Sequence, residues 1–165
     1  MTTFPANAVR SHYSSPLGRI VLCANDQALL GLWFDGQKHQ PDPLGWALVA
    51  EHPVLDQART QLDQYFAGRR QQFTLPLDLS SGTPFQQQVW RGLLQIAAGH
   101  TLSYGALSQS IGKAAAVRAV GSAVGRNPLS IVVPCHRVLG SDGSLTGYAG
   151  GLERKIALLQ LEHAL

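Results

Sequence analysis

The amino-acid sequence predicts an α+β protein with an α/β lobe in its N-terminal half and a mainly helical lobe in its C-terminal half. Its 165 residues suffice for one medium domain or two small ones. Short apolar runs separated by turn residues dominate the chain before residue 80, and strong helix-start signals dominate it afterwards. The run Ser80-Ser81-Gly82 is the expected junction, so we place the two lobes at residues 1–82 and 83–165.

The first lobe should contain a small antiparallel sheet. Two apolar runs, 19–24 and 28–34, flank an Asn-Asp turn, which is typical of a β-hairpin. A breaker-rich stretch follows over residues 36–45. Residues 73–79 alternate as a further strand, and Pro76 restricts that strand to a sheet edge.

One helix should accompany this sheet. Pro53 suits the first position of a helix, and Gly68 is placed to end it. Between them, apolar residues recur near helical spacing at Val54, Ala58, Leu62 and Tyr65.

The second lobe begins with the clearest helix of the chain. Thr83 is a suitable N-cap, Pro84 occupies the first helical position and Gln86 completes a capping box. The apolar residues Phe85, Val89, Leu93 and Ile96 then recur on one face.

Two shorter helices follow, and together they predict a helix-turn-helix. Ser103 can cap a helix that runs through Ile111 and stops at Gly112, and a second helix begins within 114–117. On the second helix the core-facing stripe should be Val117, Val120 and Val124. The opposite side presents Arg118, Ser122 and Gly125, one long cation among small residues. That face can approach another surface closely, or its small residues can simply pack against a neighbouring helix.

The two cysteines, Cys23 and Cys135, share no short metal-binding or redox spacing, so no metal site is expected. A single disulfide between them is conceivable but has no support in the pattern. Cys23 lies in an apolar strand, where a cysteine usually acts as a small hydrophobic residue. We therefore interpret Cys23 as structural.

Charge is distributed unevenly along the chain. Residues 1–82 carry six Lys or Arg and seven Asp or Glu, whereas residues 83–165 carry seven and three. The basic second half fits an anionic partner, nucleic acid first, although a mildly basic solvated surface explains it as well. No apolar run approaches the roughly 20 residues of a membrane span, and the N-terminus lacks the order of a signal peptide. We expect a cytoplasmic protein without a membrane partner.

Cys135 is the candidate nucleophile. The run 131–133 predicts a buried strand, and Pro134 fixes the backbone immediately before the thiol. His136 and Arg137 follow directly, and a neighbouring imidazole or guanidinium favours the reactive thiolate. A direct Cys135–His136 hydrogen bond requires a turn or a bridging water, because adjacent residues of a strand point to opposite faces. An inert thiol beside a histidine by chance is the alternative.

A C-terminal helix should supply a carboxylate to this site. It starts near Gly151 and puts Leu152, Ile156 and Leu159 on its buried stripe. Glu162 falls near that inner face, where it can orient a histidine as the third member of a catalytic triad does. A partly exposed Glu162 paired with Lys155 is the alternative. Upstream, Asn127-Pro128 breaks a helix, and the Asn127 amide can tie two backbone segments together.

These motifs resemble the O6-alkylguanine-DNA alkyltransferases, also called methylated-DNA:protein-cysteine methyltransferases. The resemblance rests on Pro134-Cys135-His136-Arg137-Val138, on Arg118-Ala119-Val120-Gly121, on Asn127-Pro128, on Gly147-Tyr148-Ala149-Gly150-Gly151 and on the final Leu-Leu-x-x-Glu, and it covers about residues 85–162. It implies a winged helix-turn-helix lobe that enters the minor groove of double-stranded DNA, flips out the alkylated guanine and presents it to the thiolate.

The resemblance also implies residue roles. Cys135 would be the nucleophile and alkyl acceptor, His136 the base that acts through a water, Glu162 its orienting carboxylate and Asn127 a hinge residue that braces the site. Substrate-binding positions would be Tyr104, Val138, Tyr148, Ala149, Gly150 and Lys155. DNA-binding positions would be Arg118, which fills the space left by the flipped base, with Ser122, Gly125 and Arg126. Some family members have serine at the position of Ala149, and a backbone donor survives that change.

The resemblance further implies irreversible single use without a cofactor, since nothing in the chain could hydrolyse the thioether product. It fits a stand-alone repair protein that is monomeric in solution, because the metal-binding cysteine cluster of the related bacterial regulators is missing from the sequence. It leaves open whether O4-alkylthymine is also a substrate. Two rival functions stay open at this point: a Cys-His thiol hydrolase, and a winged-helix DNA binder without catalysis.

Overall fold

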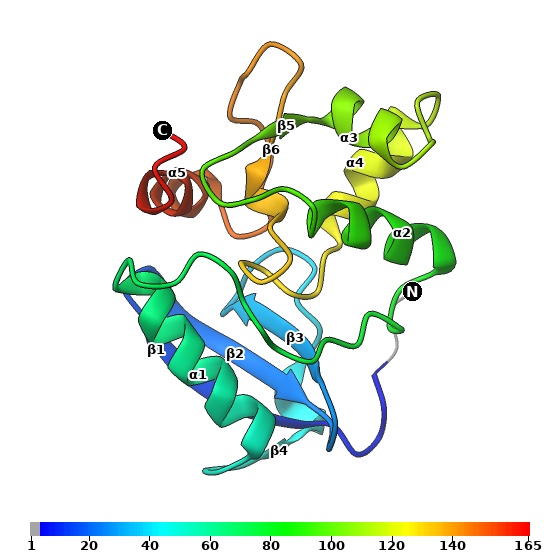
Figure 1. The fold of residues 1–165 in the computed structure, drawn as a ribbon. Coiled ribbons are helices and arrows are strands. Elements are labelled where there is room, and N and C mark those ends of the chain that lie inside the picture. Colours follow the sequence, from blue (N-terminus) through cyan, green and yellow to red (C-terminus); the bar gives the residue numbers. More distant parts are fainter. Residues whose placement is uncertain (1–3) are drawn as a thin grey trace.

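The computed structural model describes residues 4–165, in which a sheet with one helix on its face lies against a group of helices (Figure 1). The four strands are β1 (Val9–Ser15), β2 (Gly18–Ala24), β3 (Leu29–Phe34) and β4 (Ala47–Leu48), and their order in the sheet is β3-β2-β1-β4. The predicted hairpin is β2–β3. The sheet is mixed and not purely antiparallel as expected, because the short β4 pairs with β1 in parallel.

Helix α1 (Pro53–Phe66) packs on this sheet and begins where the sequence predicts. The ring nitrogen Nδ1 of His52 caps it by accepting from the backbone N–H groups of Val54 and Leu55. Gly68 follows its end with φ +74°, a left-handed conformation that glycine adopts without steric cost. Its buried face presents Val54, Leu55, Ala58, Gln61, Leu62 and Tyr65.

The second half contains α2 (Pro84–Leu93), β5 (Leu102–Ser103), α3 (Tyr104–Ser110), α4 (Val117–Gly125), β6 (Val138–Leu139) and α5 (Leu152–Leu161), with short 3₁₀ turns η1 (Pro43–Gly45) and η2 (Cys135–Arg137). The capping box of Thr83 and Gln86 is present. Ser103 Oγ accepts from the Ala106 N–H at the start of α3, also as expected. The tight turn between α3 and α4 gives the predicted helix-turn-helix.

Two strand predictions were wrong. Residues 131–133 form turns, with Ile131 at φ +72°, although their β-branched side chains are buried. Residues 73–79 contribute only one isolated bridge, between Leu77 and Leu29. In both places tertiary contacts override the local preference of apolar, β-branched residues for strands.

Two predicted stripe residues also lie outside the core. Val117 is 39% exposed and Leu152 is 46% exposed, and each is the first residue of its helix. The buried residues of α4 are Val120, Ala123 and Val124, and those of α5 are Lys155, Leu158 and Leu159. Val120 and Val124 of α4 and Leu159 of α5 are thus buried as predicted, whereas the first residue of each predicted stripe is not.

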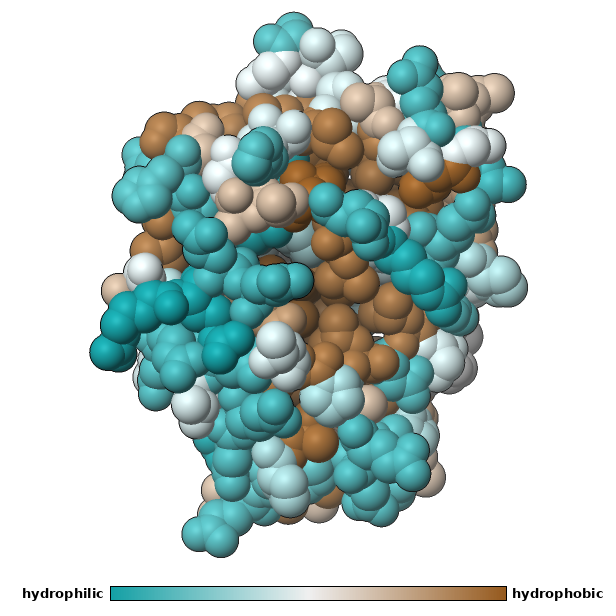
Figure 2. Space-filling model, viewed as in Figure 1, coloured by the Kyte–Doolittle hydropathy of each residue, from teal (hydrophilic) through white to brown (hydrophobic). Residues whose placement is uncertain are grey.

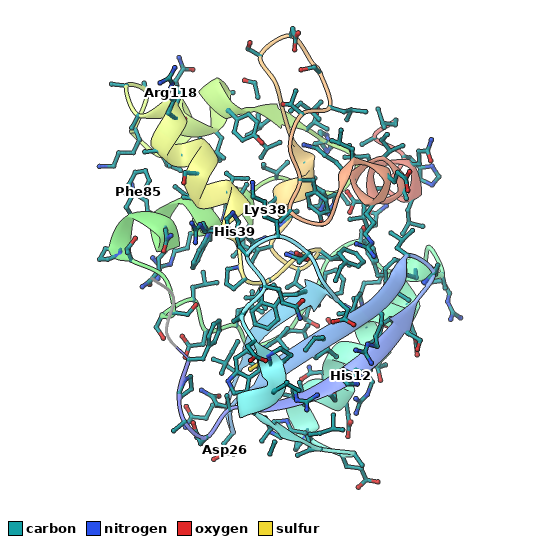
Figure 3. All side chains as sticks on the ribbon, turned by 180° about the vertical axis from the view of Figure 1, so that it is seen from behind. His12, Asp26, Lys38, His39, Phe85 and Arg118 are labelled. Atoms are coloured by element: carbon teal, nitrogen blue, oxygen red, sulfur yellow. The ribbon has the colours of Figure 1, made fainter. Side chains whose placement is uncertain are left out.

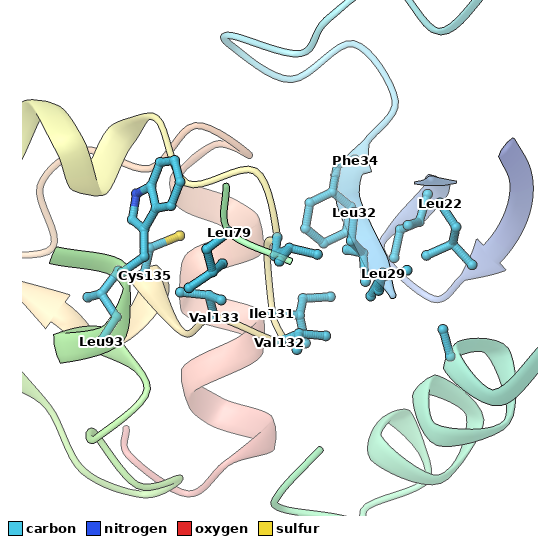
Figure 4. Close-up of a cluster of buried hydrophobic side chains, with 14 of the residues drawn as sticks. Leu22, Leu29, Leu32, Phe34, Leu79, Leu93, Ile131, Val132, Val133 and Cys135 are labelled. Carbon is cyan, nitrogen blue, oxygen red and sulfur yellow. The ribbon is translucent and has the colours of Figure 1, made fainter. Parts of the chain in front are cut away.

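The two halves share one hydrophobic core, which runs from the sheet to the neighbourhood of Cys135 (Figure 4). Backbone hydrogen bonds cross the junction, because Leu32 N donates to Pro128 O (2.8 Å) and Ser130 N donates to Leu32 O (2.9 Å). On the face seen in Figure 2, hydrophobic residues extend across the middle of the molecule between hydrophilic flanks. None of the helices in residues 4–165 has the length and apolar character to cross a bilayer.

Candidate active site

Cys135 lies at a cavity of about 280 Å³ between the two halves. Cys135 is only 6% exposed, and it is the first residue of the turn η2, directly after Pro134. The cavity is bounded by the loop after β3, by α3 and α4, and by the loop before α5. Its lining residues are Lys38, His39, Tyr104, Gly121, Val124, Gly125, Cys135, Gly147, Tyr148 and Ala149.

A buried chain of hydrogen bonds lies behind the cysteine. His136 Nε2 is 2.8 Å from Glu162 Oε2, and both side chains are almost fully buried. Arg137 Nε donates to Glu162 Oε1 (2.8 Å), and a second guanidinium nitrogen of Arg137 donates to Oε2 (2.9 Å). The inward Glu162 expected from the sequence is therefore present, and its partners are His136 and Arg137.

This geometry assigns the protonation of the histidine. Burial by itself would raise the pKa of Glu162, but hydrogen bonds from His136 and Arg137, together with the positive charge of Arg137, outweigh burial and bring the pKa to about 2. Glu162 is thus ionised, and its carboxylate accepts a hydrogen bond from the N–H at His136 Nε2. His136 Nδ1 is left as the basic nitrogen, and this buried atom has no hydrogen-bond partner within the described part of the chain.

The thiol itself is neutral at rest. Burial raises the pKa of Cys135, while the Asn127 amide, the Lys155 ammonium and the local backbone oppose that rise. Burial also lowers the pKa of His136, against the attraction of Glu162. The expectation that Arg137 favours the thiolate was wrong, because its guanidinium is bound to Glu162 and to the Ile96 carbonyl.

Asn127 joins two backbone segments, as its position after α4 suggests. Its Nδ2 donates to Val133 O (2.8 Å), and its Oδ1 accepts from Leu129 N (3.0 Å). These bonds hold the turns that lead from α4 to Cys135. The side chain is buried, so it braces the segment that carries the nucleophile.

Lys155 is fully buried, and it is not the ion-pair partner of Glu162. Its Nζ donates to the carbonyls of Val138 (2.6 Å), Thr146 (3.1 Å) and Gly147 (3.1 Å). Burial lowers the pKa of its ammonium. Lys155 thereby ties β6 and the loop before α5 together, outside the lining of the cavity.

The other predicted substrate-binding residues fall into two groups. Tyr104, Tyr148 and Ala149 line the cavity, and the Ala149 carbonyl accepts from Lys38 N (3.1 Å). Val138 and Gly150 do not line it: the Val138 carbonyl binds Lys155, and Gly150 packs between Tyr148 and Phe34. The roles of all these residues in binding a base stay predictions.

The face of α4 predicted to meet DNA is open to solvent at Arg118 and Ser122, and Gly125 lies on the cavity wall. Arg118 lies at one end of α4, and Lys38 and His39 lie beside the other end (Figure 3). Arg126 follows the helix and is exposed. Among residues 4–165, no three His, Cys, Asp or Glu side chains gather as metal ligands.

Sequence reasoning missed Lys38 and His39 as residues of the cavity. They lie in a breaker-rich loop, and His39 has φ +65°. Nothing in the local pattern indicates that this loop reaches the second half of the chain. The contact is made by the hydrogen bond from Lys38 N to Ala149 O and by that from Ser130 Oγ to Gln37 Oε1 (3.2 Å).

Comparison with known proteins agrees with this geometry. Residues 8–79 match the family model of the 6-O-methylguanine DNA methyltransferase ribonuclease-like domain, and residues 84–164 match that of the 6-O-methylguanine DNA methyltransferase DNA binding domain. A methylated-DNA--protein-cysteine methyltransferase of Mycobacterium leprae is 47% identical over 148 residues, which cover 90% of this chain and 88% of that protein.

Solved structures from Mycobacterium tuberculosis are also similar. The O6-methylguanine methyltransferase superimposes with a TM-score of 0.86 at 43% identity, covering 95% of this chain and 93% of the other. A structure of the same organism's OGT in complex with DNA gives 0.85 at 43% identity, with coverage of 94% and 92%. The chain therefore belongs to the 6-O-methylguanine DNA methyltransferase family.

Proposed function

We propose that the protein repairs DNA by moving the alkyl group of O6-alkylguanine onto Cys135, in a single irreversible step. The chain is a methylated-DNA--protein-cysteine methyltransferase by family, and its partner is double-stranded DNA. The observation that carries the assignment of the acceptor is the buried Cys135, backed by the His136–Glu162 pair, at a cavity beside α4.

In the proposed step, the Cys135 proton passes through a water to His136 Nδ1, and Glu162 stabilises the imidazolium that forms. The thiolate attacks the alkyl carbon, a C–S bond forms, and the bond from that carbon to O6 breaks with its electron pair on the base. In this proposal the hydroxyl of Tyr104, which lines the cavity, donates a hydrogen bond to the guanine and offsets the negative charge that develops on it. The product is a thioether, so each molecule acts once.

The burial of Cys135 requires the base to leave the duplex. A thiol that is 6% exposed cannot reach an alkyl group inside stacked DNA, so the target nucleotide must rotate into the cavity. The exposed face of α4, with Arg118 among small residues, suits insertion into the minor groove. In this proposal residues 83–165 carry the chemistry, and residues 1–82 supply one wall of the cavity.

An oligonucleotide duplex with radiolabelled O6-methylguanine tests this function. We expect label on Cys135, up to one per chain, and none in a Cys135→Ser variant. Cys23→Ser is the matched control, since Cys23 is buried in the sheet, and it should accept label as the wild type does. Repeated turnover would indicate a thiol hydrolase, and DNA binding without label would indicate a non-catalytic binder. A duplex with O4-methylthymine measures the breadth of substrates.

A further inference from the structure

The carboxylate behind the active site has a partner from the other half of the molecule. Within residues 4–165, four hydrogen bonds end on Glu162: one from His136, two from Arg137 and one from Tyr65. The Tyr65 hydroxyl donates to Oε2 over 2.6 Å, and this bond joins residues 97 positions apart. Tyr65 is 2% exposed and belongs to α1, on the sheet.

The ring of Tyr65 is held in place by other aromatic side chains. Phe66 packs edge-on at 5.2 Å between ring centroids, and Phe73 lies at 5.4 Å. Burial and the nearby Glu162 charge raise the pKa of Tyr65, so its hydroxyl stays neutral and keeps its proton. Tyr65 is therefore a fixed donor aimed at Oε2, the oxygen that also binds His136.

We propose that Tyr65 is a positioning residue for alkyl transfer, which holds the Glu162 carboxylate between His136 and Arg137 and so sets the orientation and basicity of His136. This inference rests on the proposed function. Through this hydrogen bond the first half of the chain would contribute to catalysis, in addition to supplying one wall of the cavity. Tyr65 itself does not line the cavity, so it acts through Glu162.

The physical reason is competition for negative charge. Each donor on Oε2 reduces the charge that His136 experiences, and it also limits rotation of the carboxylate. Without the Tyr65 hydroxyl, Glu162 would stabilise the imidazolium more strongly. The other ionisable groups around the histidine are Arg137 on η2, Lys155 on α5 and Tyr148 on the loop before α5. All of them remain when Tyr65 is changed to Phe.

The test compares Tyr65→Phe with Tyr13→Phe. Tyr13 also donates to a carboxylate over 2.6 Å, that of Asp63 on α1, and neither Tyr13 nor Asp63 is among the groups that shift the pKa of His136. Each variant loses one hydroxyl and one hydrogen bond, and both should be less stable. The rate of Cys135 alkylation by free O6-benzylguanine is measured from pH 4 to pH 9, which removes DNA binding from the comparison.

We expect the acid limb of the rate profile to move up by about half a pH unit or more in Tyr65→Phe, because the histidine must lose its proton to act as a base. Tyr13→Phe should keep the wild-type midpoint. An NMR titration of the His136 ring should show the same shift, whether or not the protein transfers alkyl groups.

The two proposals can fail separately. If the wild type takes no label on Cys135, the proposed function fails while the ring titration still tests the coupling of Tyr65 to His136. If transfer occurs but Tyr65→Phe keeps the wild-type midpoint, the positioning role is overturned, even where the variant is slower or less stable. A shift of the ring titration without a shift of the rate profile also overturns it.

Discussion

Replacing Glu162 with Gln should destabilise the protein at neutral pH and much less in acid. The side chain is buried, and its pKa falls from the usual 4.5 to about 2 in the folded protein. A lowering of about 2 units or more corresponds to about 3 kcal/mol, at about 1.4 kcal/mol per unit. Gln keeps the size of the side chain but lacks the charge that His136 and Arg137 bind.

The sign of the pH dependence follows from the lowered pKa. A carboxylate that ionises more easily in the folded state stabilises the fold fully above its unfolded pKa, and that stability disappears as the pH falls towards 2. The contribution of Glu162 should be about 3 kcal/mol at pH 7 and about half of that or less at pH 3. Urea unfolding of wild type and Glu162→Gln at the two pH values measures both differences.

A control on the same helix separates this effect from a general loss of negative charge. Glu153 is exposed in the first turn of α5, so Glu153→Gln should change stability by less than about 0.5 kcal/mol at either pH. An equal loss for Glu162→Gln at pH 7 and pH 3 would refute the assignment of an ionised, buried Glu162. The loss would then come from packing alone.

Two further substitutions test other parts of the site. Lys155→Met should lower the free energy of unfolding by about 3 kcal/mol or more, because it leaves the carbonyls of Val138, Thr146 and Gly147 without their shared donor. An unchanged midpoint of urea unfolding would contradict this. Arg118→Ala should slow alkyl transfer from duplex DNA by about tenfold or more. The reaction with free O6-benzylguanine should be unchanged, because Arg118 is exposed at the end of α4 away from Lys38 and His39. Equal losses on both substrates would contradict the role of Arg118 in base flipping.

Features that depend on local chemistry could be predicted from the sequence. The capping box of Thr83 and Gln86 concerns residues three apart, and the end of α1 at Gly68 depends on one backbone conformation. The inward direction of Glu162 follows from its spacing after Lys155 and Leu159 of α5. Periodicity was less reliable at helix starts, where Val117 and Leu152 have fewer neighbours to cover them.

Features that depend on contacts between the halves could not be predicted. Backbone bonds tie Pro128 and Ser130 to β3 just before the turns at 131–133, and the Asn127 amide binds the Val133 carbonyl at their end, whereas β-branched residues alone favour a strand. Lys38, His39 and Tyr65 carry no local sign of their place at the site. Tyr65 shows only that it belongs on the buried face of a helix, and its hydroxyl meets Glu162 because two distant segments fold together.

Burial acts in opposite directions on the two groups that exchange a proton in the proposed reaction. It raises the pKa of Cys135 and lowers that of His136, so the resting site holds a thiol and a neutral imidazole. Only the thiolate is strongly nucleophilic, so the resting cysteine is protected from other electrophiles. In the proposed reaction the thiolate and imidazolium would form only once a base occupies the cavity, with Glu162 already in place at 2.8 Å to stabilise the imidazolium. If Cys135 is consumed in one reaction as proposed, this delay would tie its reactivity to the arrival of the substrate.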